Sequence, residues 1–273
     1  MEKGPSGGEA VDLNEPPSFQ VCFDYNGSTI QRSNGQVGET MSWNQSSYAG
    51  TEVSSARIIA FLTKVYGWMF AGLLITALSA FVVASSPALI EAVILNRMVF
   101  WILIIAQLGL VFFLSARVEH MTPATAAGLF MLYSALTGVT ASVILLIYTG
   151  ASIASTFVIT AGMFGALAVF GTVTRKDLSG WGSFLFMGLI GLILASVVGI
   201  FWQNDALQFV ISVVGVLVFT GLTAWDAQRL KHMAVALPDG RVGSYAVVGA
   251  LSLYLDFINL FFFLLRLTGG RRD

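Results

Sequence analysis

The residues best placed to do chemistry are two aspartates in the most apolar part of the sequence. Asp256 lies inside the run 247–265, which is otherwise dominated by apolar residues. Asp226 closes the apolar run that precedes it. An ionised carboxylate at the centre of a bilayer costs roughly 3 kcal/mol, so an ionisable group there usually marks a functional site. These two acids, on consecutive apolar segments, are therefore the leading candidates for such a site.

Paired carboxylates in a membrane interior have a defined chemistry. Two adjacent carboxylates in a low-dielectric site repel each other, so they bind and release protons as a unit. At low pH the pair shares a proton, and when both groups are ionised their oxygen atoms attract a hard cation. The sequence therefore predicts that Asp226 and Asp256 form a proton-sensing pair that also contacts a passing cation. No cofactor is predicted.

Three further residues are expected to support the pair. Ser252 and Asn259 lie four residues before and three residues after Asp256, so they share its face of a helix. This polar stripe indicates a buried or water-lined face rather than a lipid-facing one. Arg117 closes the second apolar segment and is the best-placed arginine to neutralise the pair. The alternative interpretation of Arg117 is a positively charged anchor at the inner membrane surface.

The predicted depths of the two acids differ. Asp226 is three residues before Arg229, near the inner end of its segment. Asp256 is ten residues before Arg266, which places it about 15 Å from the outer end, near mid-membrane. The two acids meet only if the first helix extends inward or the second begins late. Arg266 itself is expected to extend its charged group to the outer headgroups.

Composition identifies the setting of these residues as a membrane. The 273 residues are 56% hydrophobic and 11% charged, whereas soluble domains are about 25% charged. A helix needs about 20 apolar residues to cross the hydrocarbon core. Seven segments meet this requirement: 59–83, 97–116, 123–147, 151–173, 182–202, 206–228 and 245–267. The predicted fold is an all-α membrane protein, a bundle of seven transmembrane helices in the lipid bilayer.

The polar N-terminal segment differs from the rest of the chain. Residues 1–55 are rich in Gly, Ser, Asn and Gln, and we expect a disordered tail there. Residues 56–270 form the predicted membrane domain. Lys and Arg counts in the short loops favour a cytoplasmic N-terminus and an external C-terminus. Without a basic cluster among exposed aromatics we expect no nucleic-acid binding, and the single cysteine, Cys22, excludes an intrachain disulfide.

Four stretches of the sequence resemble one known family. They are 134–138, 174–179, 219–230 and 250–261, and the last contains Asp256 between Leu255 and Phe257. These stretches are similar to the motifs of the Bax inhibitor family of membrane proteins, the transmembrane Bax-inhibitor-motif group. The chain looks closest to the bacterial branch of that family. The resemblance covers about residues 55–270.

The resemblance implies a fold, an activity and residue roles. It implies a seven-helix bundle with the last helix central, in a bacterial inner membrane. It also implies a pH-sensitive calcium leak in which Asp226 and Asp256 form the sensor and gate and contact calcium transiently. An arginine near the inner end of helix two contacts the pair in some members, and Arg117 is an approximate match to it. Trp225 departs from the more usual tyrosine at its position.

Two other functions fit parts of the sequence. The first is an intramembrane aspartyl protease, which also carries two membrane aspartates. Such proteases have a Gly-x-Gly-Asp run, whereas Leu253, Tyr254 and Leu255 precede Asp256 here, so we expect no enzymatic activity. The second is a binding regulator of a membrane-bound ATP-dependent protease, or of cell-death and stress signalling, without ion transport. Deleting residues 1–53 separates a regulator that uses the tail from a channel.

Overall fold

The structure, a computed structural model, describes residues 22–23, 29–30, 42–202 and 204–271. The chain forms two compact units, Met1–Thr51 and Glu52–Asp273. In the first unit, β1 (Cys22–Phe23) and β2 (Thr29–Ile30) pair in antiparallel fashion. The predicted disorder of residues 1–55 falls largely on residues outside the described ranges.

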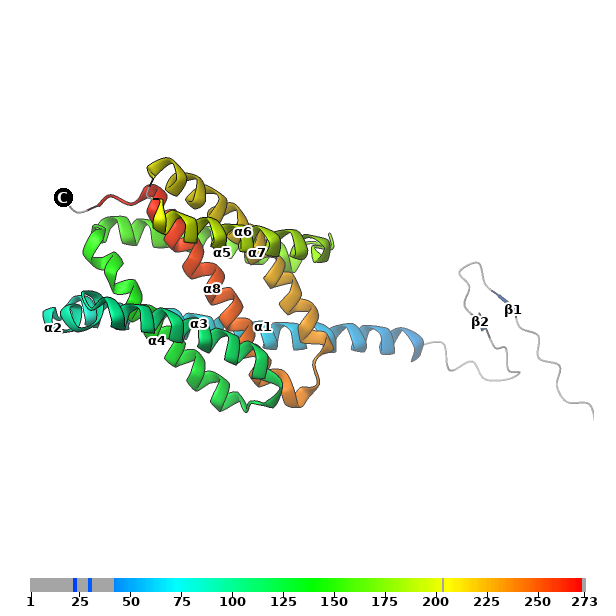
Figure 1. Ribbon diagram of the computed structural model, residues 1–273. Helices are drawn as coiled ribbons and strands as arrows, with labels where there is room; N and C mark the ends of the chain where they lie inside the picture. Colours follow the sequence, from blue (N-terminus) through cyan, green and yellow to red (C-terminus); the bar gives the residue numbers. More distant parts are fainter. Residues whose placement is uncertain (1–21, 24–28, 31–41, 203, 272–273) are drawn as a thin grey trace, which may run out of the picture. The chain divides into compact units, whose positions relative to one another are not determined.

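The second unit is built from helices (Figure 1). Within the described residues, seven helices are long and apolar enough to cross a membrane. They are α1 (Ser42–Ala84, with Ser55–Ala84 as the candidate span), α3 (Arg97–Arg117), α4 (Pro123–Ile147), α5 (Gly150–Val173), α6 (Ser179–Phe201), α7 (Asp205–Ala236) and α8 (Val242–Thr268). Shorter turns lie between them, namely α2 (Pro87–Leu89), η1 (Ile90–Ile94), η2 (Val118–His120) and η3 (Asp239–Arg241). The predicted all-α membrane bundle is confirmed, whereas the predicted side of each end stays a prediction.

Two helices are clearly longer than the apolar segments that the sequence predicts, α1 at its start and α7 at its end. The hydrophobic segment 206–228 corresponds to α7, which continues to Ala236. Leu230 and Ala234 lie in this continuation, and each is only 3% exposed. Because they are four residues apart, they share the core-facing side of the helix while charged residues occupy the other side. Mean hydropathy ends the apolar segment at the first charged residues, but the amphipathic pattern continues the helix to Ala236.

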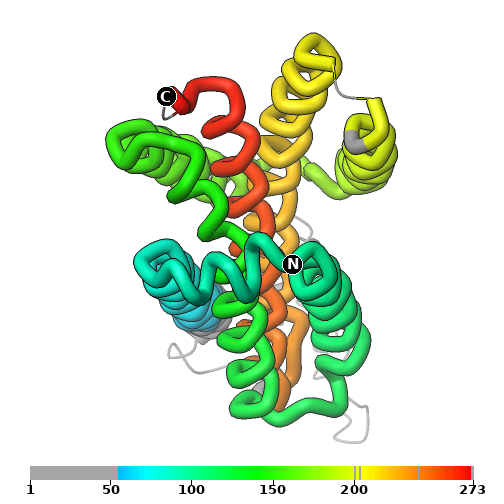
Figure 2. The backbone as a smooth tube through the Cα atoms, turned by 60° about the vertical axis from the view of Figure 1, so that its left-hand side comes forward, coloured from blue at the N-terminus to red at the C-terminus, as the bar shows by residue number. Residues whose placement is uncertain are grey.

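The last helix, α8, is the most buried of the seven. It packs against α4, α5 and α7, and Figure 1 and Figure 2 both show α7 and α8 side by side. Leu253, Tyr254 and Leu260 on this helix are fully buried. Most of α8 is therefore surrounded by protein, which shields its polar side chains from lipid. Its central place in the bundle stays a prediction.

Two glycines allow neighbouring helices to approach closely. A Cβ at Gly171 of α5 would meet the backbone of Ala224 on α7, and one at Gly138 of α4 would meet the backbone of Thr76 on α1. Small residues at such contacts permit tight packing of membrane helices. Ala224 is two residues before Asp226, so the contact with α5 supports the part of α7 that carries this acid.

Candidate functional site

The extension of α7 changes the relative depth of the two aspartates. Asp226 is ten residues before the end of α7 at Ala236, and Asp256 is fourteen residues after the start of α8 at Val242. With a rise of about 1.5 Å per residue, their distances from the α7–α8 connection differ by only about 6 Å. The predicted depth difference therefore arose from a helix end that the sequence placed too early.

Both carboxyl groups are buried, and they lie close together. Asp226 is 7% exposed and Asp256 is 4% exposed. The two side chains lie close enough for each to influence the protonation of the other. Because a carboxylate has no proton to donate, a hydrogen bond between two carboxyl groups requires that one of them be protonated. The arrangement therefore fits a pair that holds one proton between its two members.

The two acids differ in their other partners. Arg229 lies one helical turn after Asp226, and its Nη1 atom is 3.6 Å from Asp226 Oδ1. Asp256 Oδ2 is buried, and in the described part of the chain no donor hydrogen-bonds to it. A buried carboxyl oxygen that has lost its water and gained no donor carries an uncompensated desolvation cost. The site thus joins an acid that has a counter-ion to an acid that has none.

Arg229 connects this buried site to the protein surface. Its side chain is 53% exposed, whereas that of Asp226 is 9% exposed. The guanidinium lies 5.3 Å from the centre of the Trp225 ring, within the range of a cation–π contact. A Cβ at Gly182 of α6 would come within 2.6 Å of this ring, so α6 approaches the indole closely. Trp225 and Asp226 together position the arginine.

A neighbouring amide ties α7 to the connection between α5 and α6. The buried Gln228 side chain donates from Nε2 to the carbonyl of Lys176 and accepts at Oε1 from the amide of Leu178, both at 2.8 Å. The Lys231 ammonium donates to the carbonyl of Thr172, near the end of α5, at 2.7 Å. Two hydrogen bonds therefore link the helix that carries Asp226 to this connection, and a third links it to the end of α5.

A second polar cluster surrounds Tyr254, two residues before Asp256 on α8. The Tyr254 hydroxyl is 2.6 Å from Thr76 Oγ1 of α1, and Thr76 also donates to the carbonyl of Ser134 at 2.9 Å. The Phe130 ring meets the Tyr254 ring edge to face, with centroids 5.6 Å apart. Because two residues advance a helix by about 200°, the tyrosine and the aspartate point to nearly opposite sides of α8.

The structure does not place the other predicted residues against the pair. Arg117 is exposed at the end of α3 and, among the described residues, makes no ion pair with either aspartate. Asn259 donates to the carbonyl of Leu255 at 2.8 Å rather than to Asp256. Ser252 is half-buried and likewise has no hydrogen bond to Asp256 in the part of the chain that is described. The arginine that reaches the pair is Arg229 instead, and a gating role for Arg117 stays a prediction.

The sequence contained a signal for Arg229 but little signal for Gln228. Arg229 follows Asp226 by three residues, and oppositely charged residues at this spacing face each other on a helix. The apolar segment 206–228 does not predict this pairing, because it ends one residue before Arg229 and leaves the arginine outside the helix. Gln228 bonds backbone atoms some fifty residues away in sequence, at Lys176 and Leu178, and no local pattern indicates such partners.

The two carboxyl groups of the pair provide fewer oxygen atoms than a resident calcium ion takes. Within the described residues, no group of three or more His, Cys, Asp or Glu side chains is gathered to hold a metal ion. Calcium takes six to eight oxygen ligands, more than Asp226 and Asp256 can supply. The transient calcium contact stays a prediction.

Comparison with known proteins identifies the family. Residues 59–273 match the family described as Inhibitor of apoptosis-promoting Bax1. The chain is 50% identical over 220 residues to Inner membrane protein YbhL of Escherichia coli (strain K12), a match that covers 80% of this chain and 94% of that protein. It is 47% identical over 215 residues to an uncharacterized protein of Borreliella burgdorferi, covering 78% and 93% of the two chains.

These relatives also indicate the branch and the setting. A Rickettsia prowazekii protein is 41% identical over 214 residues, covering 78% of this chain and 90% of its own. All three relatives are bacterial, and the name of the first supports a place in a bacterial inner membrane. With seven candidate spans and these matches, the chain belongs to the bacterial branch of the Bax inhibitor family as a multi-pass membrane protein.

Proposed function

We propose that this protein is a slow calcium leak across the membrane, gated by protonation of the Asp226–Asp256 pair. The observation that carries the proposal is that two buried carboxyl groups lie close together and that Asp256 Oδ2 has no donor among the described residues. A group that only maintains the fold normally has its buried hydrogen-bonding atoms satisfied. An unsatisfied acid beside a second acid is instead suited to gain and lose a proton.

The shared proton holds the closed state. While one carboxyl is protonated, it donates to the other, and Arg229 balances the remaining charge on Asp226. Loss of the proton leaves two negative charges in contact in a low-dielectric site, and they repel strongly. We expect this repulsion to move α7 away from α8 and to open a path for the ion.

The same deprotonation prepares the site for a cation. Two ionised carboxylates provide hard oxygen atoms, and a doubly charged ion between them relieves their repulsion. Calcium therefore passes as the transported ion, and no cofactor takes part. Flux is expected to rise as the pH rises through the range in which the pair loses its proton.

A calcium-flux assay on reconstituted protein tests the proposal. Proteoliposomes with an internal calcium dye are compared between about pH 6 and pH 8, the range in which a perturbed buried acid can titrate. Wild-type flux should depend on pH, and Asp256→Asn should lose that dependence because an amide does not ionise. Asp177→Asn, which removes an exposed acid in the α5–α6 connection, serves as the matched control. Unchanged flux with unchanged pH dependence in Asp256→Asn would overturn the proposal.

The protein is proposed to act without enzymatic activity. Proteolysis at an aspartate pair needs an open backbone beside the acids, but Tyr254 is buried and bonded to Thr76 two residues from Asp256. Cleavage of a membrane substrate that is lost in Asp256→Ala would contradict this. The alternative role, regulation of a membrane-bound protease or of cell-death signalling, depends on the N-terminal tail. Deleting residues 1–53 abolishes a tail-dependent effect but leaves the flux of a channel.

A further inference from the structure

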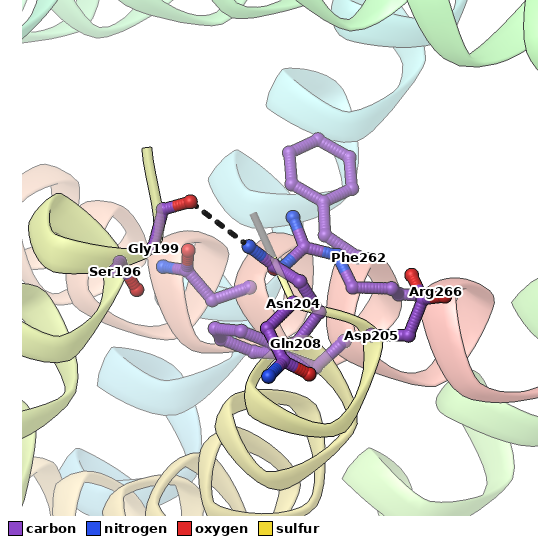
Figure 3. A pocket seen from close by; sticks show the side chains of 9 residues that line it. Ser196, Gly199, Asn204, Asp205, Gln208, Phe262 and Arg266 are labelled. Carbon is purple, nitrogen blue, oxygen red and sulfur yellow. Dashed lines mark hydrogen bonds between the residues drawn. The ribbon is translucent and has the colours of Figure 1, made fainter. Parts of the chain in front are cut away.

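A second polar region lies at the ends of α6, α7 and α8, away from the α7–α8 connection. A cavity of about 780 Å³ opens there, and several polar side chains line it. Its walls are formed by Ser196, Gly199, Asn204, Asp205, Gln208, Asn259, Phe262, Phe263 and Arg266 (Figure 3). A cavity of this size and polarity has room and hydrogen-bonding partners for several water molecules.

The cation on the cavity wall is held by an amide. Arg266 Nη1 donates to Gln208 Oε1 at 3.0 Å, and Gln208 Nε2 is 3.4 Å from the carbonyl of Gly199 (Figure 3). The sequence predicts only that Arg266 extends its charged group to the headgroups. In the structure the guanidinium is also hydrogen-bonded to Gln208. Asp205 lines the same cavity, but among the described residues it makes no ion pair with Arg266. The Arg266 guanidinium therefore lies beside the cavity without a bonded counter-ion among the described residues.

The cavity approaches the aspartate pair along α8. Asn259 lines the cavity and lies three residues after Asp256, a rise of about 4.5 Å. Phe263 forms another part of the wall and stacks on Phe219 of α7, with ring centroids 5.9 Å apart. Along α8 the cavity wall thus comes within about one helical turn of Asp256, and the stacked pair Phe219–Phe263 borders the wall.

We propose that this cavity is the water-filled vestibule through which the transported cation approaches the pair, and that Arg266 limits cation access to it. The proposal rests on the proposed calcium leak. A fixed positive charge at the mouth of a narrow polar cavity raises the energy of a nearby cation, and more so for a divalent ion. Gln208 is the positioning residue, because its bond to Arg266 keeps the guanidinium over the cavity.

Cysteine accessibility tests the vestibule independently of any flux. In a Cys22→Ser background, Ser196→Cys places a thiol on the cavity wall, and Ser212→Cys places one in a fully buried position four residues after Gln208. A membrane-impermeant maleimide added to each side of oriented vesicles should label Ser196→Cys from one side only and leave Ser212→Cys unlabelled. Absence of labelling at Ser196→Cys from both sides means that lipid or protein fills the cavity, and it overturns the vestibule.

Flux measurements test the role of the charge. Arg266→Gln should raise the initial calcium flux on the order of fivefold, because the fixed charge acts on a doubly charged ion. Arg266→Lys retains the charge and should stay within about twofold of wild type. Equal flux in Arg266→Gln and wild type would overturn the inference about Arg266. If wild-type vesicles show no calcium flux at all, the proposed leak fails, whereas one-sided labelling of Ser196→Cys would still identify a vestibule.

Discussion

Two polar side chains on α8, Tyr254 and Asp256, are separated by one residue but have opposite surroundings. The tyrosine hydroxyl is bonded to Thr76, which in turn bonds the backbone of α4. Asp256 has an oxygen with no donor in the described part of the chain, and its neighbouring group is another acid. Both side chains are buried. Burial alone therefore does not distinguish the two, whereas hydrogen bonding does.

The difference in hydrogen bonding suggests a structural role for Tyr254 and a pH-responsive role for Asp256. A satisfied hydroxyl fixes α1, α4 and α8 against one another, since every atom has a partner that would be lost on movement. When an acid pair with one unsatisfied oxygen loses its proton, the two carboxylates repel each other, and no hydrogen bond to that oxygen opposes their separation. On this basis one side of α8 is anchored, and the opposite side is able to respond to pH.

The largest expected effect concerns the counter-ion of the pair. Arg229→Gln should lower the free energy of unfolding at neutral pH by about 1–2 kcal/mol, less than for a fully buried pair because Arg229 is half exposed. Arg117→Gln is the matched control and should change little, since that side chain is exposed without an ion pair to the aspartates in the described chain. Unfolding in mixed micelles at low ionic strength measures both variants.

A double-mutant cycle sharpens this assignment. In an Asp226→Asn background, Arg229→Gln should cost almost nothing, because no carboxylate remains for the guanidinium to balance. An equal cost in both backgrounds would assign the effect of Arg229 to its contact with Trp225. If Arg117→Gln lowers the free energy of unfolding more than Arg229→Gln does, then Arg117 is the counter-ion of the pair, as the sequence predicts, and Arg229 is not.

A smaller effect is expected on the anchored side of α8. Tyr254→Phe should lower the free energy of unfolding by about 1 kcal/mol, because the ring packing remains and only the bond to Thr76 is lost. The pH dependence of calcium flux should remain. Tyr66→Phe is the control, since the Tyr66 hydroxyl makes no hydrogen bond within the described residues. Loss of pH dependence in Tyr254→Phe would mean that both sides of α8 belong to the switch.

The smallest expected effect concerns Asp177, a carboxyl group that accepts hydrogen bonds from Ser179. Asp177 lies outside the membrane spans, and hydrogen bonds from the Ser179 hydroxyl and backbone amide lower the pKa of its carboxyl group below the ordinary value. A lowered pKa in the folded state stabilises the fold above the ordinary pKa of about 3.9, and that contribution disappears as the pH falls through the lowered value. Ser179→Ala should raise the pKa of Asp177 toward the ordinary value.

Carboxyl titration by NMR measures this shift. Ser155→Ala, which removes another exposed hydroxyl that bonds only the backbone of its own helix, should leave the Asp177 titration unchanged. An unchanged pKa in Ser179→Ala would show that local donors do not control this acid. Asp177 would then no longer illustrate how hydrogen-bond donors distinguish one acid from another, such as Asp256, that has an oxygen without a donor.

The fold followed from the sequence because its signals are local. Seven apolar segments predict seven helices, and Pro123 marks the start of α4 as the first residue of the helix, where proline is favoured. The end of α7 did not follow, because hydropathy does not register a helix that continues with one apolar side. Only the packing of Leu230 and Ala234 against the core reveals that continuation.

The site was predictable in part. Asp226 and Asp256 are visible as acids in apolar runs, and the structure buries both and brings them close together, whereas their role as a sensor stays a prediction. The cavity beside Arg266 was not predicted, since it depends on where three helices diverge. The expected support from Ser252 and Asn259 was inferred from helical spacing, which gives a shared face but not the choice of partner. Asn259 satisfies its amide on the backbone of its own helix.

The Gln228 amide has a consequence for how motion at the acids can be observed. It bonds both Lys176 and Leu178, so the α5–α6 connection follows α7 when that helix turns about its axis. Lys176 is exposed, and its side chain takes no part in these bonds. A spectroscopic label on this side chain would sit outside the bilayer and report a rearrangement that begins at two buried carboxyl groups.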